Sequence, residues 1–448
     1  MSMPRLVVLG AGYGGIRFIL KLKQLAGNQL PYHLTVVDQR DYHLLSQLLH
    51  EAATERVSFE EITLPIREIV GPAAEVITAP VVGLDPYAGE VILPERRLPY
   101  DYLVVALGSE TDFFEIPGLE QHSFTLKSLD DAVAINAHVH TCFQKAAGLT
   151  APRERAPWLT FVVGGGGFAG TQMAGELAEW LPRLADFYRL PRQELRLVLL
   201  EAAPQILRGF DPVLAPLGEE LLRRKGVEVH LDSPVRQRTP EEVVFGQGER
   251  IATQTLIWTG GVRGTATLER LHLPLGPRQR LQVDSHLRVR GHERIYAVGD
   301  NALITDPETG KPLPTSAQYA LQQGDVAALN LWAEWHGRPL IPYEPKIRGI
   351  AISIGREEAL ATIGSYRFTG LQAALFKQLI LLKYIFSLRN LRLVVRHSST
   401  PLLALCRRLP CRIPVTTPQG QVLRLRSRSA ELGDLERSLR STFSPRRL

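Results

Sequence analysis

The sequence predicts an α/β protein built around two doubly wound parallel sheets. Two observations carry this prediction. A glycine cluster lies close to the start of the chain, in VVLGAGYGGIRF at residues 7–18, and a second one, FVVGGGGFAG, lies at residues 161–170. Each cluster follows a short apolar run of the kind that forms a buried parallel strand, and each precedes a helical pattern. The chain has 448 residues, which is enough for two or three domains.

The first cluster fits the pattern G-x-G-x-x-G at a strand-to-helix turn. Gly10 allows the tight turn, Gly12 leaves room for a pyrophosphate beside the backbone, and Gly15 lets the helix pack closely on the strand. The next strand, at residues 33–37, ends in Asp38, a carboxylate that can accept hydrogen bonds from an adenosine ribose. This order of strand, loop, helix, strand and acid predicts a dinucleotide site. The alternative is a glycine-rich turn followed by a solvated aspartate.

The second cluster repeats this arrangement. Gly165, Gly167 and Gly170 form the loop, and the following strand ends in Glu201. A carboxylate at this point favours a free ribose 2′-OH and repels a 2′-phosphate, so NADH is expected over NADPH, although Arg208 lies close enough in sequence to weaken that preference. The alternative is a second unit that keeps the fold without a ligand. Two dinucleotide sites in one chain indicate one tightly held and one exchanging nucleotide, with two-electron transfer between them.

Cysteine content and hydropathy exclude several classes of protein. The three cysteines, Cys142, Cys406 and Cys411, include no C-x-x-C pair, so neither a zinc ribbon nor a CxxC redox disulfide is encoded. This cysteine usage fits a reducing cytoplasm. No apolar run reaches ~18 uncharged residues, and the chain does not open on a basic segment followed by an apolar one. We therefore expect neither a spanning helix nor a signal peptide.

The basic residues are unevenly placed along the chain. Residues 359–430 contain twelve Lys and Arg and no Asp or Glu, so this window carries +12 and the remainder carries −6 of the net charge of +6. Such a region is typical of contact with a polyanion, either nucleic acid or an anionic membrane. Residues 368–388 are apolar with sparse lysines, and Arg389, Arg392 and Arg396 follow. They predict a helix lying in a membrane interface, and the leucine-rich face argues against nucleic acid. A buried core helix is the alternative.

With both loops and five further segments, the sequence resembles the two-dinucleotide-binding-domain flavoproteins. Within them it is similar to the type II NADH:quinone oxidoreductases, over roughly residues 4–396. The further segments are DYLVVALG at 101–108, IWTGGV at 257–262, IYAVGD at 295–300, LPTSAQYALQQ at 313–323 and SIGR at 353–356.

The resemblance implies FAD at the first loop and NADH at the second. Hydride would pass from the nicotinamide to flavin N5, and a membrane quinone of menaquinone, ubiquinone or plastoquinone type would be the acceptor. The resemblance also implies cofactor contacts at Gly108, Gly260, Asp300 and Ala317, with Asp300 at the ribityl–phosphate end of the flavin. Ala317 lies in a helix expected at residues 315–330, whose N-terminus could stabilise negative charge on a reduced flavin.

Three glutamines are the candidate catalytic residues. Gln318 and Gln322 share one helical face, which the resemblance places beside a quinone pocket; a pair of exposed glutamines is the alternative. Gln172 stands where the family usually has glutamate, and an amide can carry neither a proton nor a charge at neutral pH. His43 and His50 are alternative proton carriers, because histidine titrates near neutral pH.

We expect three parts. An FAD-binding domain spans residues 1–115 and 266–330, an NADH-binding domain is inserted at 116–265, and a C-terminal membrane-facing region spans 331–448. Within the last, a short strand at 422–425 and a helix at 431–439 are expected without an assigned function. The protein is expected to be peripheral on the cytoplasmic face of the cell membrane, bound to an anionic surface and to no nucleic acid, with a homodimer left open. Two alternatives are a sulfide:quinone oxidoreductase, which needs paired cysteines beside the flavin, and a non-catalytic NADH-sensing membrane flavoprotein.

Overall fold

The structure is a computed structural model that describes residues 3–27, 31–306, 310–347 and 349–388, with two short strands further on. The chain divides into two units, residues 1–390 and residues 391–448. In the second unit, strands β26 and β27 pair antiparallel, and β27 agrees with the strand expected at 422–425. The helix expected at 431–439, and Arg389, Arg392 and Arg396, lie outside the described residues. The two strands are β26 (Val415–Thr416) and β27 (Val422–Leu423).

The first glycine loop belongs to a five-stranded parallel sheet of order β21-β9-β1-β2-β5. The central strand β1 lies between β2 and β9, with Val8 opposite Val36 on one side and Val104 on the other. β21 joins this sheet although it lies far along the chain from the others, so the sheet is discontinuous in sequence. The strands are β1 (Arg5–Leu9), β2 (His33–Asp38), β5 (Ala74–Thr78), β9 (Tyr102–Val105) and β21 (Ile295–Ala297).

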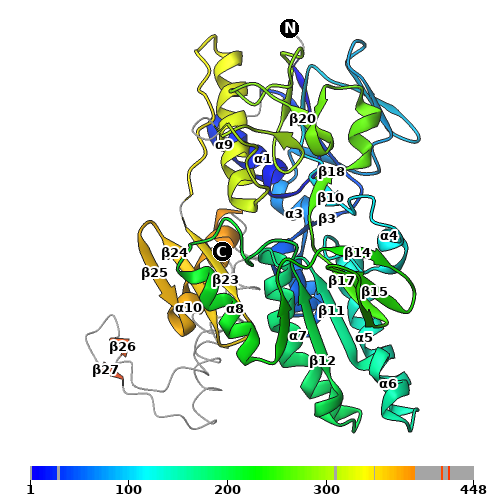
Figure 1. The fold of residues 1–448 in the computed structure, drawn as a ribbon. Helices are drawn as coiled ribbons and strands as arrows, with labels where there is room; N and C mark the ends of the chain where they lie inside the picture. The colour runs from blue at the N-terminus through cyan, green and yellow to red at the C-terminus, as the bar shows by residue number, and fades with distance from the viewer. Residues whose placement is uncertain are drawn as a thin grey trace, which may run out of the picture. The chain divides into compact units, whose positions relative to one another are not determined.

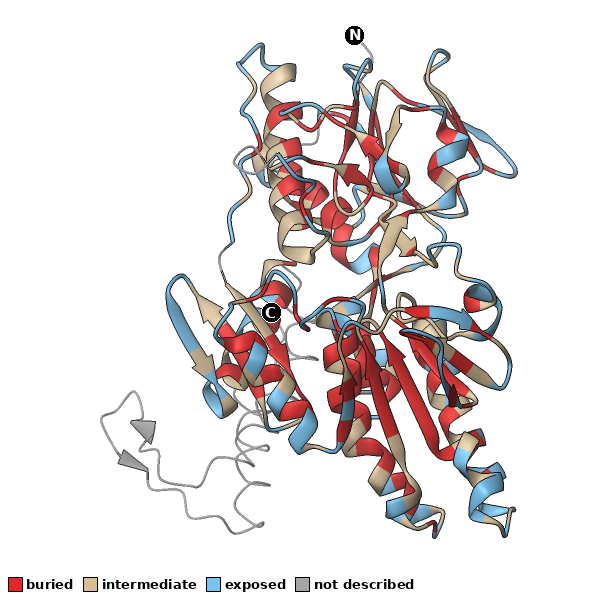
Figure 2. Ribbon diagram, in the orientation of Figure 1, coloured by how far each residue is buried: buried red, intermediate tan, exposed pale blue. Residues whose placement is uncertain are grey.

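The second glycine loop belongs to a four-stranded parallel sheet of order β13-β12-β11-β17. Here β11 lies between β12 and β17, as β1 lies between β2 and β9, so the two sheets share one local topology. Their strands are mostly buried, which explains their continuous apolar sequences (Figure 2). The strands are β11 (Thr160–Gly164), β12 (Arg196–Leu200), β13 (Val227–His230) and β17 (Thr255–Trp258).

A long helix follows each glycine loop, as predicted, and a third helix packs on the first. These helices are α1 (Tyr13–Ala26), α7 (Phe168–Phe187) and α9 (Ala317–Trp335) (Figure 1). Glycines let α9 approach α1 closely, because a Cβ at Gly324 would lie 2.6 Å from the carbonyl oxygen of Gly14. α9 begins at Ala317 rather than at 315, because the Ser316 side chain caps the helix by accepting a hydrogen bond from the Tyr319 N–H at 3.2 Å.

Shorter elements complete these two halves. The antiparallel pairs and sheets are β3 (Tyr42–Leu44) with β4 (Thr63–Pro65); β6 (Gly83–Asp85), β7 (Glu90–Ile92) and β8 (Arg97–Pro99); β10 (Ser109–Thr111) with β18 (Val262–Gly264); and β14 (Val235–Arg238), β15 (Glu242–Phe245) and β16 (Glu249–Ala252). A mixed sheet joins β19 (Leu275–Gly276), β20 (Arg280–Gln282) and β22 (Ala302–Leu303). The remaining helices are α2 (Leu49–Ala53), α3 (Ile66–Val70), α4 (Leu119–His122), α5 (Leu129–Ala147), α6 (Pro152–Leu159) and α8 (Leu214–Arg224).

Residues 350–388 form a small antiparallel sheet covered by one helix. The helix expected over 368–388 begins at Gly370, because the preceding residues pair as a strand with β24. Ala373 of this helix packs against Ala359 and Ala361 of the sheet. Among the described residues, no helix is long and apolar enough to cross a membrane. The elements are β23 (Ile350–Ser353), β24 (Ala359–Ile363), β25 (Tyr366–Thr369) and α10 (Gly370–Ser387).

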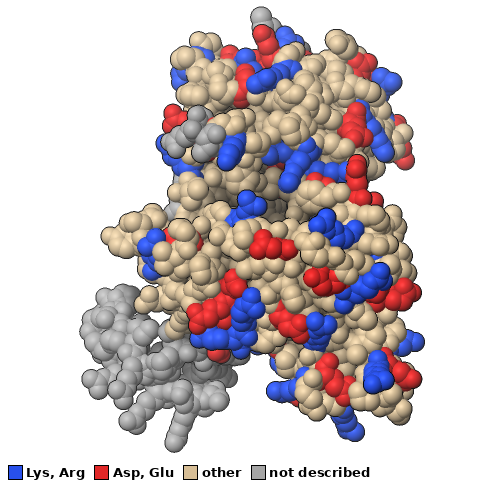
Figure 3. Space-filling model, viewed as in Figure 1, with Lys and Arg blue, Asp and Glu red and all other residues tan. Residues whose placement is uncertain are grey.

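On the face drawn in Figure 3, acidic and basic side chains are interspersed over the described part of the chain. This distribution agrees with a body that lacks the strongly basic window. Most of residues 359–430, which carry that charge, lie beyond Leu388 and outside the described ranges.

Candidate functional site

The first glycine loop is shaped by close packing at two of its glycines and by open space at the third. Gly10 has a φ of 97°, and a Cβ there would collide with the carbonyl oxygen of Ala106 after β9. A Cβ at Gly15 would collide with the carbonyl oxygen of Gly10. At Gly12, a Cβ would meet no atom within 4 Å. The loop therefore leaves a free cradle at the N-terminus of α1, which suits a pyrophosphate.

The second loop repeats these three environments. Gly165 has a φ of 102°, and a Cβ there would lie 2.7 Å from Gly260 after β17. A Cβ at Gly170 would collide with the carbonyl oxygen of Gly165, whereas a Cβ at Gly167 would meet nothing within 4 Å. Gly260 thus acts through close packing beneath the second loop. Both loops lie where the strand order reverses, which is where ligands bind in open α/β sheets.

The two strand-end acids hold the loops in the same way. Asp38 accepts hydrogen bonds from the Ala11 N–H at 2.7 Å and the Arg40 N–H at 2.9 Å. Glu201 accepts from the Gly166 N–H at 2.6 Å and the Ala203 N–H at 2.8 Å. Burial raises the pKa of Asp38, and its backbone hydrogen bonds only partly oppose this. Each carboxylate therefore ties its glycine loop to the turn after the second strand, in the position that suits a ribose.

Asn301 connects the ends of two strands of the first sheet and was missed by the sequence reasoning. Its side chain is fully buried; its oxygen accepts from the Gly108 N–H at 3.0 Å, and its amide donates to the carbonyl of Val105 at 3.0 Å. It therefore ties the end of β9 to the turn after β21. A signal was available, because Asn301 directly follows Asp300 at a strand end.

Asp300 belongs to a small polar group at the same edge of the sheet. Its carboxylate accepts a hydrogen bond from Ser109 Oγ at 2.7 Å and lies 3.8 Å from Lys127 Nζ. Lys127 Nζ also donates to Ser109 Oγ at 2.8 Å. Lys127 and Ser109 were likewise missed, because they come from segments distant in sequence. The group places a lysine beside an aspartate at the carboxyl ends of β9 and β21.

The glutamines of α9 fall into two classes. Gln318 donates to the carbonyl of Gly349 at 3.0 Å, and Gln322 exchanges hydrogen bonds with the backbone of Lys346, at 2.8 and 3.0 Å. Both therefore hold the segment that leads from α9 to β23, and their catalytic role stays a prediction. The buried Gln323, which the sequence reasoning passed over, accepts from the Gly299 N–H at 2.6 Å. It fixes the turn that carries Asp300.

Three aromatic side chains pack together beside the first loop. The ring of Tyr384, on α10, lies 4.9 Å from that of Tyr13 at the start of α1 and 5.8 Å from that of His43. His43 Nδ1 lies 2.8 Å from the Ala11 carbonyl, so this nitrogen carries the proton and Nε2 accepts from the Tyr384 hydroxyl at 2.7 Å. Burial lowers the pKa of His43 to about 4. A neutral, hydrogen-bonded His43 argues against its role as a proton carrier.

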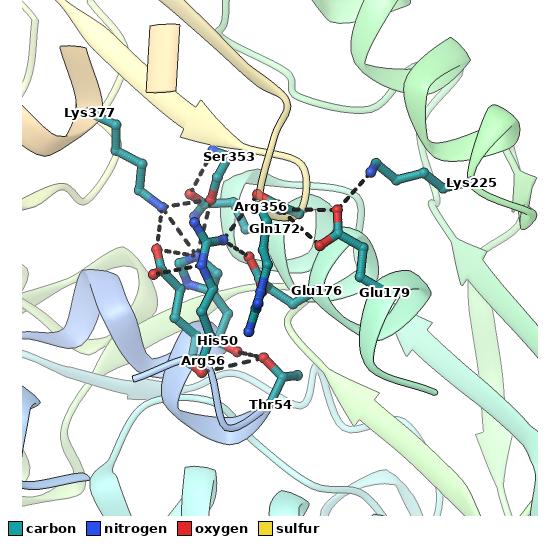
Figure 4. A network of polar contacts seen from close by, with 12 residues as sticks. His50, Thr54, Arg56, Gln172, Glu176, Glu179, Lys225, Ser353, Arg356 and Lys377 are labelled. Atoms are coloured by element: carbon teal, nitrogen blue, oxygen red, sulfur yellow. Dashed lines mark hydrogen bonds and ion pairs between the residues drawn. The ribbon is translucent and has the colours of Figure 1, made fainter. Parts of the chain in front are cut away.

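A buried charge cluster joins α2, α7 and α10 (Figure 4). We define it as Glu51, Arg56, Glu176 and Lys377. Lys377 Nζ donates to Glu51 Oε1 at 2.8 Å, and Arg56 lies between the two glutamates, 3.4 Å from Glu51 and in hydrogen-bond contact with Glu176. Both carboxylates are only 3% exposed. Two acids and two bases thus balance in charge inside the protein.

The two carboxylates of the cluster differ in their acidity. Burial alone would raise the pKa of Glu51, but Lys377 and Arg56 outweigh it and lower the pKa to about 2. At Glu176 burial prevails over Arg56 and raises the pKa. Burial and Lys377 together lower the pKa of His50 to about 3, which disfavours its role as a proton carrier at neutral pH.

Gln172 lies at the edge of the charge cluster, one helical turn before Glu176. Its side-chain oxygen accepts from the Ser353 N–H at 3.3 Å, and Ser353 Oγ accepts from Lys377 Nζ at 2.6 Å. The same helix carries Glu179, which binds the Arg356 N–H through both oxygens at 3.0 Å. Gln172 is thereby connected to Lys377 through Ser353, and its catalytic role stays a prediction.

The second site opens onto a cavity. The cavity measures about 390 Å³ and lies beyond the end of β12. Its lining consists of Glu201, Ala202, Ala203, Pro204, Gln205 and Arg208.

The described part of the chain does not contain a pair of cysteines for redox chemistry. Cys142 is buried on α5 and unpaired, and burial raises the pKa of its thiol to about 11. Its sulfur lies 3.3 Å from His138 Nε2 and 3.6 Å from the Thr255 hydroxyl. Cys406 and Cys411 lie outside the described residues. Nothing in the described ranges therefore supplies the cysteine pair that a sulfide:quinone oxidoreductase needs.

Several known proteins are similar to this chain. The type II NADH:quinone oxidoreductase of Staphylococcus saprophyticus is 28% identical over 88% of this chain and 98% of its own length, and that of Staphylococcus haemolyticus is 29% identical with the same coverage. Among solved structures, NDH2 from Plasmodium falciparum in complex with NADH has a TM-score of 0.79 at 18% identity, covering 89% of this chain and 98% of the other.

A sulfide:quinone oxidoreductase from Aquifex aeolicus has a TM-score of 0.72 at 18% identity, covering 86% of this chain and 92% of the other. At such identities the solved structures establish the fold alone, and the same fold serves both activities. The resemblance to type II NADH:quinone oxidoreductases is confirmed by the curated relatives. The family profile described as pyridine nucleotide-disulphide oxidoreductase matches residues 4–324. The chain therefore belongs to the pyridine nucleotide-disulphide oxidoreductase family.

Proposed function

We propose that the protein is an FAD-dependent NADH:quinone oxidoreductase that works at a membrane surface. The observation that carries the proposal is the pair of matching glycine loops, each with a strand-end acid and with free space at the start of a long helix. Two dinucleotide sites in one chain suit one nucleotide that stays bound and one that exchanges, with two-electron transfer between them. The similarity to the staphylococcal type II NADH:quinone oxidoreductases supports the same proposal.

The residues of the first site fit FAD. The free space at Gly12 would receive the pyrophosphate, Asp38 would accept hydrogen bonds from the adenosine ribose, and Asp300 lies at the opposite edge beside Lys127. Gly108 and Ala317 mark the strand end and the helix start that face this edge. When bound, FAD would supply the two-electron chemistry between NADH and a quinone.

The residues of the second site fit NADH. Gly167 leaves room for the pyrophosphate at the N-terminus of α7, and Glu201 would accept the ribose hydroxyls. The loop after β17, at Gly260, packs beneath the glycine loop in the place that Ala106 takes in the first half. NADH therefore meets a preformed site in which the protein supplies binding and orientation.

Proton supply to a quinone must come from groups other than the side chain of Gln172. The amide can only donate and accept hydrogen bonds. It is connected through Ser353 to Lys377, whose ammonium group carries exchangeable protons and is held beside Glu51. We assign the proton-holding role in this part of the protein to the charge cluster, with Gln172 as a positioning residue.

The membrane contact is proposed for one face of α10. Leu379 and Phe386 are 58% and 53% exposed on this helix, and the exposed Lys383 lies between them. These three residues fall at i, i+4 and i+7, so they share one face, while Ala373, Leu381 and Tyr384 are buried against the protein. An apolar face that carries a lysine suits the boundary of an anionic bilayer. We also propose a peripheral position on the cytoplasmic side and a quinone drawn from the bilayer; a homodimer stays an open prediction.

A steady-state assay tests the proposed activity. The purified protein should contain FAD and should oxidise NADH when a soluble quinone is supplied, with two electrons passed for each NADH. Sulfide should not replace NADH as the donor. A flavin-containing protein that binds NADH and reduces no quinone would favour the non-catalytic sensor, and a protein without flavin would end the proposal.

Liposome binding tests the membrane face. Leu379→Ser with Phe386→Ser should lower pelleting with anionic vesicles and lower turnover with long-tailed quinones, while turnover with short soluble quinones is kept. Lys383→Gln should weaken binding at low salt by about 1 kcal/mol, because one basic residue near anionic headgroups contributes that much. Phe187→Ser, which changes a 74% exposed phenylalanine on α7, is the matched control. Unchanged pelleting of the double variant would show that α10 is only a core helix. Deleting residues 368–448 is a poorer test, because it removes Lys377 and Tyr384.

A further inference from the structure

A basic side chain lies in the same cavity as the ribose-binding acid of the second site. Glu201 and Arg208 both line the cavity of about 390 Å³ beyond β12. The other lining residues, at 202–205, carry no charge. We propose that Arg208 binds the 2′-phosphate of NADPH, so that the site takes NADPH as a second substrate beside the preferred NADH. The inference rests on the proposed function of the second loop as a pyridine nucleotide site.

The backbone fixes Arg208 next to the glycine loop. Leu207 has a φ of 54° and donates its N–H to the carbonyl of Gly166 at 2.7 Å, and Gly209 follows with a φ of 84°. The Leu207 side chain is buried, which anchors the turn. Gly166 also donates its N–H to Glu201, so one residue of the loop holds both the acid and the turn that carries the arginine. These hydrogen bonds fix the position of Glu201 relative to the backbone at Arg208.

The charge of Arg208 is free to meet an anion. Arg208 is exposed, and it takes part in no ion pair among the described residues. Other arginines nearby differ in this respect: Arg223 binds Glu219, and Arg367 binds Asp211 at 2.8 Å. A guanidinium group offers several N–H donors in a plane that matches the oxygens of a phosphate.

Glu201 alone would disfavour NADPH, and its surroundings moderate this effect. Both carboxylate oxygens already accept a backbone N–H, so part of the negative charge is compensated before a ligand binds. A strand-end acid favours a free 2′-OH, and a nearby arginine accommodates a 2′-phosphate. With both side chains in one cavity, the site should bind NADH more tightly than NADPH but should still bind NADPH. A site with the acid alone would exclude NADPH.

Equilibrium binding tests this assignment without turnover. The full-length flavin-containing protein is titrated calorimetrically with NAD⁺ and with NADP⁺, and Arg208→Gln is compared with wild type. The variant should bind NADP⁺ about tenfold more weakly, since it loses a charge-assisted contact, and should bind NAD⁺ within about twofold of wild type. Arg224→Gln is the matched control, because Arg224 on α8 lies outside the cavity and forms an ion pair with Glu220 at the surface. It should change neither affinity.

A second variant tests whether the charges of Glu201 and Arg208 have opposite effects on NADP⁺ binding. Glu201→Gln should tighten NADP⁺ binding, and the gain should be larger when Arg208 is present than in the double variant. An equal loss of affinity for NAD⁺ and NADP⁺ in Arg208→Gln would show that the arginine binds the pyrophosphate that both nucleotides share, and would overturn the proposal. No change in either affinity, or no binding of NADP⁺ by wild type, would overturn it as well.

These outcomes are distinguishable from a failure of the proposed function. The binding experiment needs no quinone, so an absent NADH:quinone activity would leave an Arg208-dependent preference intact. Conversely, normal NADH turnover with an unchanged NADP⁺ affinity in Arg208→Gln would reject this inference alone.

Discussion

The two glycine loops are nearly identical in backbone and differ in what surrounds them. Gly12 and Gly167 have φ values of −73° and −70°, and each faces open space at the start of a long helix. Beside the first loop, Tyr13, His43 and Tyr384 pack together, and Asn301 ties the end of β9 to the turn after β21. Around the second, the chain leaves a cavity.

This comparison teaches that the loop fixes the class of ligand, and that its surroundings must distinguish one dinucleotide from the other. Both loops offer helix N–H groups and a ribose-binding acid, so both suit a dinucleotide. Gly12 and Gly167 are both exposed, so the loops themselves leave equal access to a pyrophosphate. The assignment of FAD to the first loop and NADH to the second therefore stays a prediction, which rests on the resemblance to type II NADH:quinone oxidoreductases.

The largest expected effect comes from matched substitutions at the two open glycines. Gly12→Val should yield a folded, colourless protein without activity, because the new side chain fits the apoprotein and occupies the pyrophosphate space. Gly167→Val should keep its flavin and raise the KM for NADH by about 100-fold, as expected for a misplaced substrate. Flavin absorbance and NADH kinetics check both variants. Loss of flavin in Gly167→Val with full flavin in Gly12→Val would reverse the assignment.

The charge cluster provides a test of how the two halves are held together, because it joins α2 of the first half to α7, the helix that follows the second loop. Glu51→Gln should lower the free energy of unfolding by about 3–5 kcal/mol near neutral pH, as is typical when one partner of a buried ion pair is removed. Glu176→Gln should cost less, because burial disfavours the ionised form of that carboxyl, as its raised pKa indicates. Urea unfolding of both variants measures the difference.

The pH dependence of the Glu51 variant follows from the sign of its pKa shift. The folded-state pKa of about 2 lies below the ordinary value of 4.5, so the carboxylate stabilises the fold above pH 4.5. This contribution is lost as pH falls from 4.5 towards 2, so wild type and Glu51→Gln should converge in stability over that window. A stability difference that stays constant down to the acid limit would contradict the ionised state of Glu51.

The smallest effect is expected from neutralising the strand-end acids one at a time. Glu201→Gln should raise the KM for NADH by about tenfold and leave the flavin in place, since a hydrogen bond to a charged group is weakened. Asp38→Asn should speed the loss of flavin in dialysis and leave the KM for NADH of the remaining holoprotein unchanged. If both substitutions act on the same nucleotide, the division of labour between the loops is wrong.

Much of the fold could be predicted from the sequence, because its signals are local. The glycines, the strand-end acids and the apolar strands lie within short windows, and their spacing alone fixes a strand-loop-helix-strand order. The structure bears out both loops and both long helices. It shifts the start of α9 to Ala317, where Ser316 caps the helix, and the start of α10 to Gly370, where β25 ends.

The site was less predictable, because its other members meet only through tertiary folding. Lys377 and Glu51 are 326 residues apart in sequence, and Asn301 and Gly108 are 193 apart. Gln318 and Gln322 were singled out by helical spacing, yet their amides hold backbone of the segment before β23. The neighbouring Gln323, one position further on, is the glutamine that fixes the turn before Asp300. A one-residue step on a helix decides which surface a side chain reaches.

The most direct test of the central claim is an anaerobic titration of the dialysed protein with NADH. We predict that FAD stays with the protein through dialysis while no nicotinamide nucleotide does, that NADH then bleaches the flavin absorbance at one NADH per flavin, and that a quinone restores it. A protein that loses its flavin in dialysis yet retains NADH, or a retained flavin that NADH does not bleach, would contradict the account.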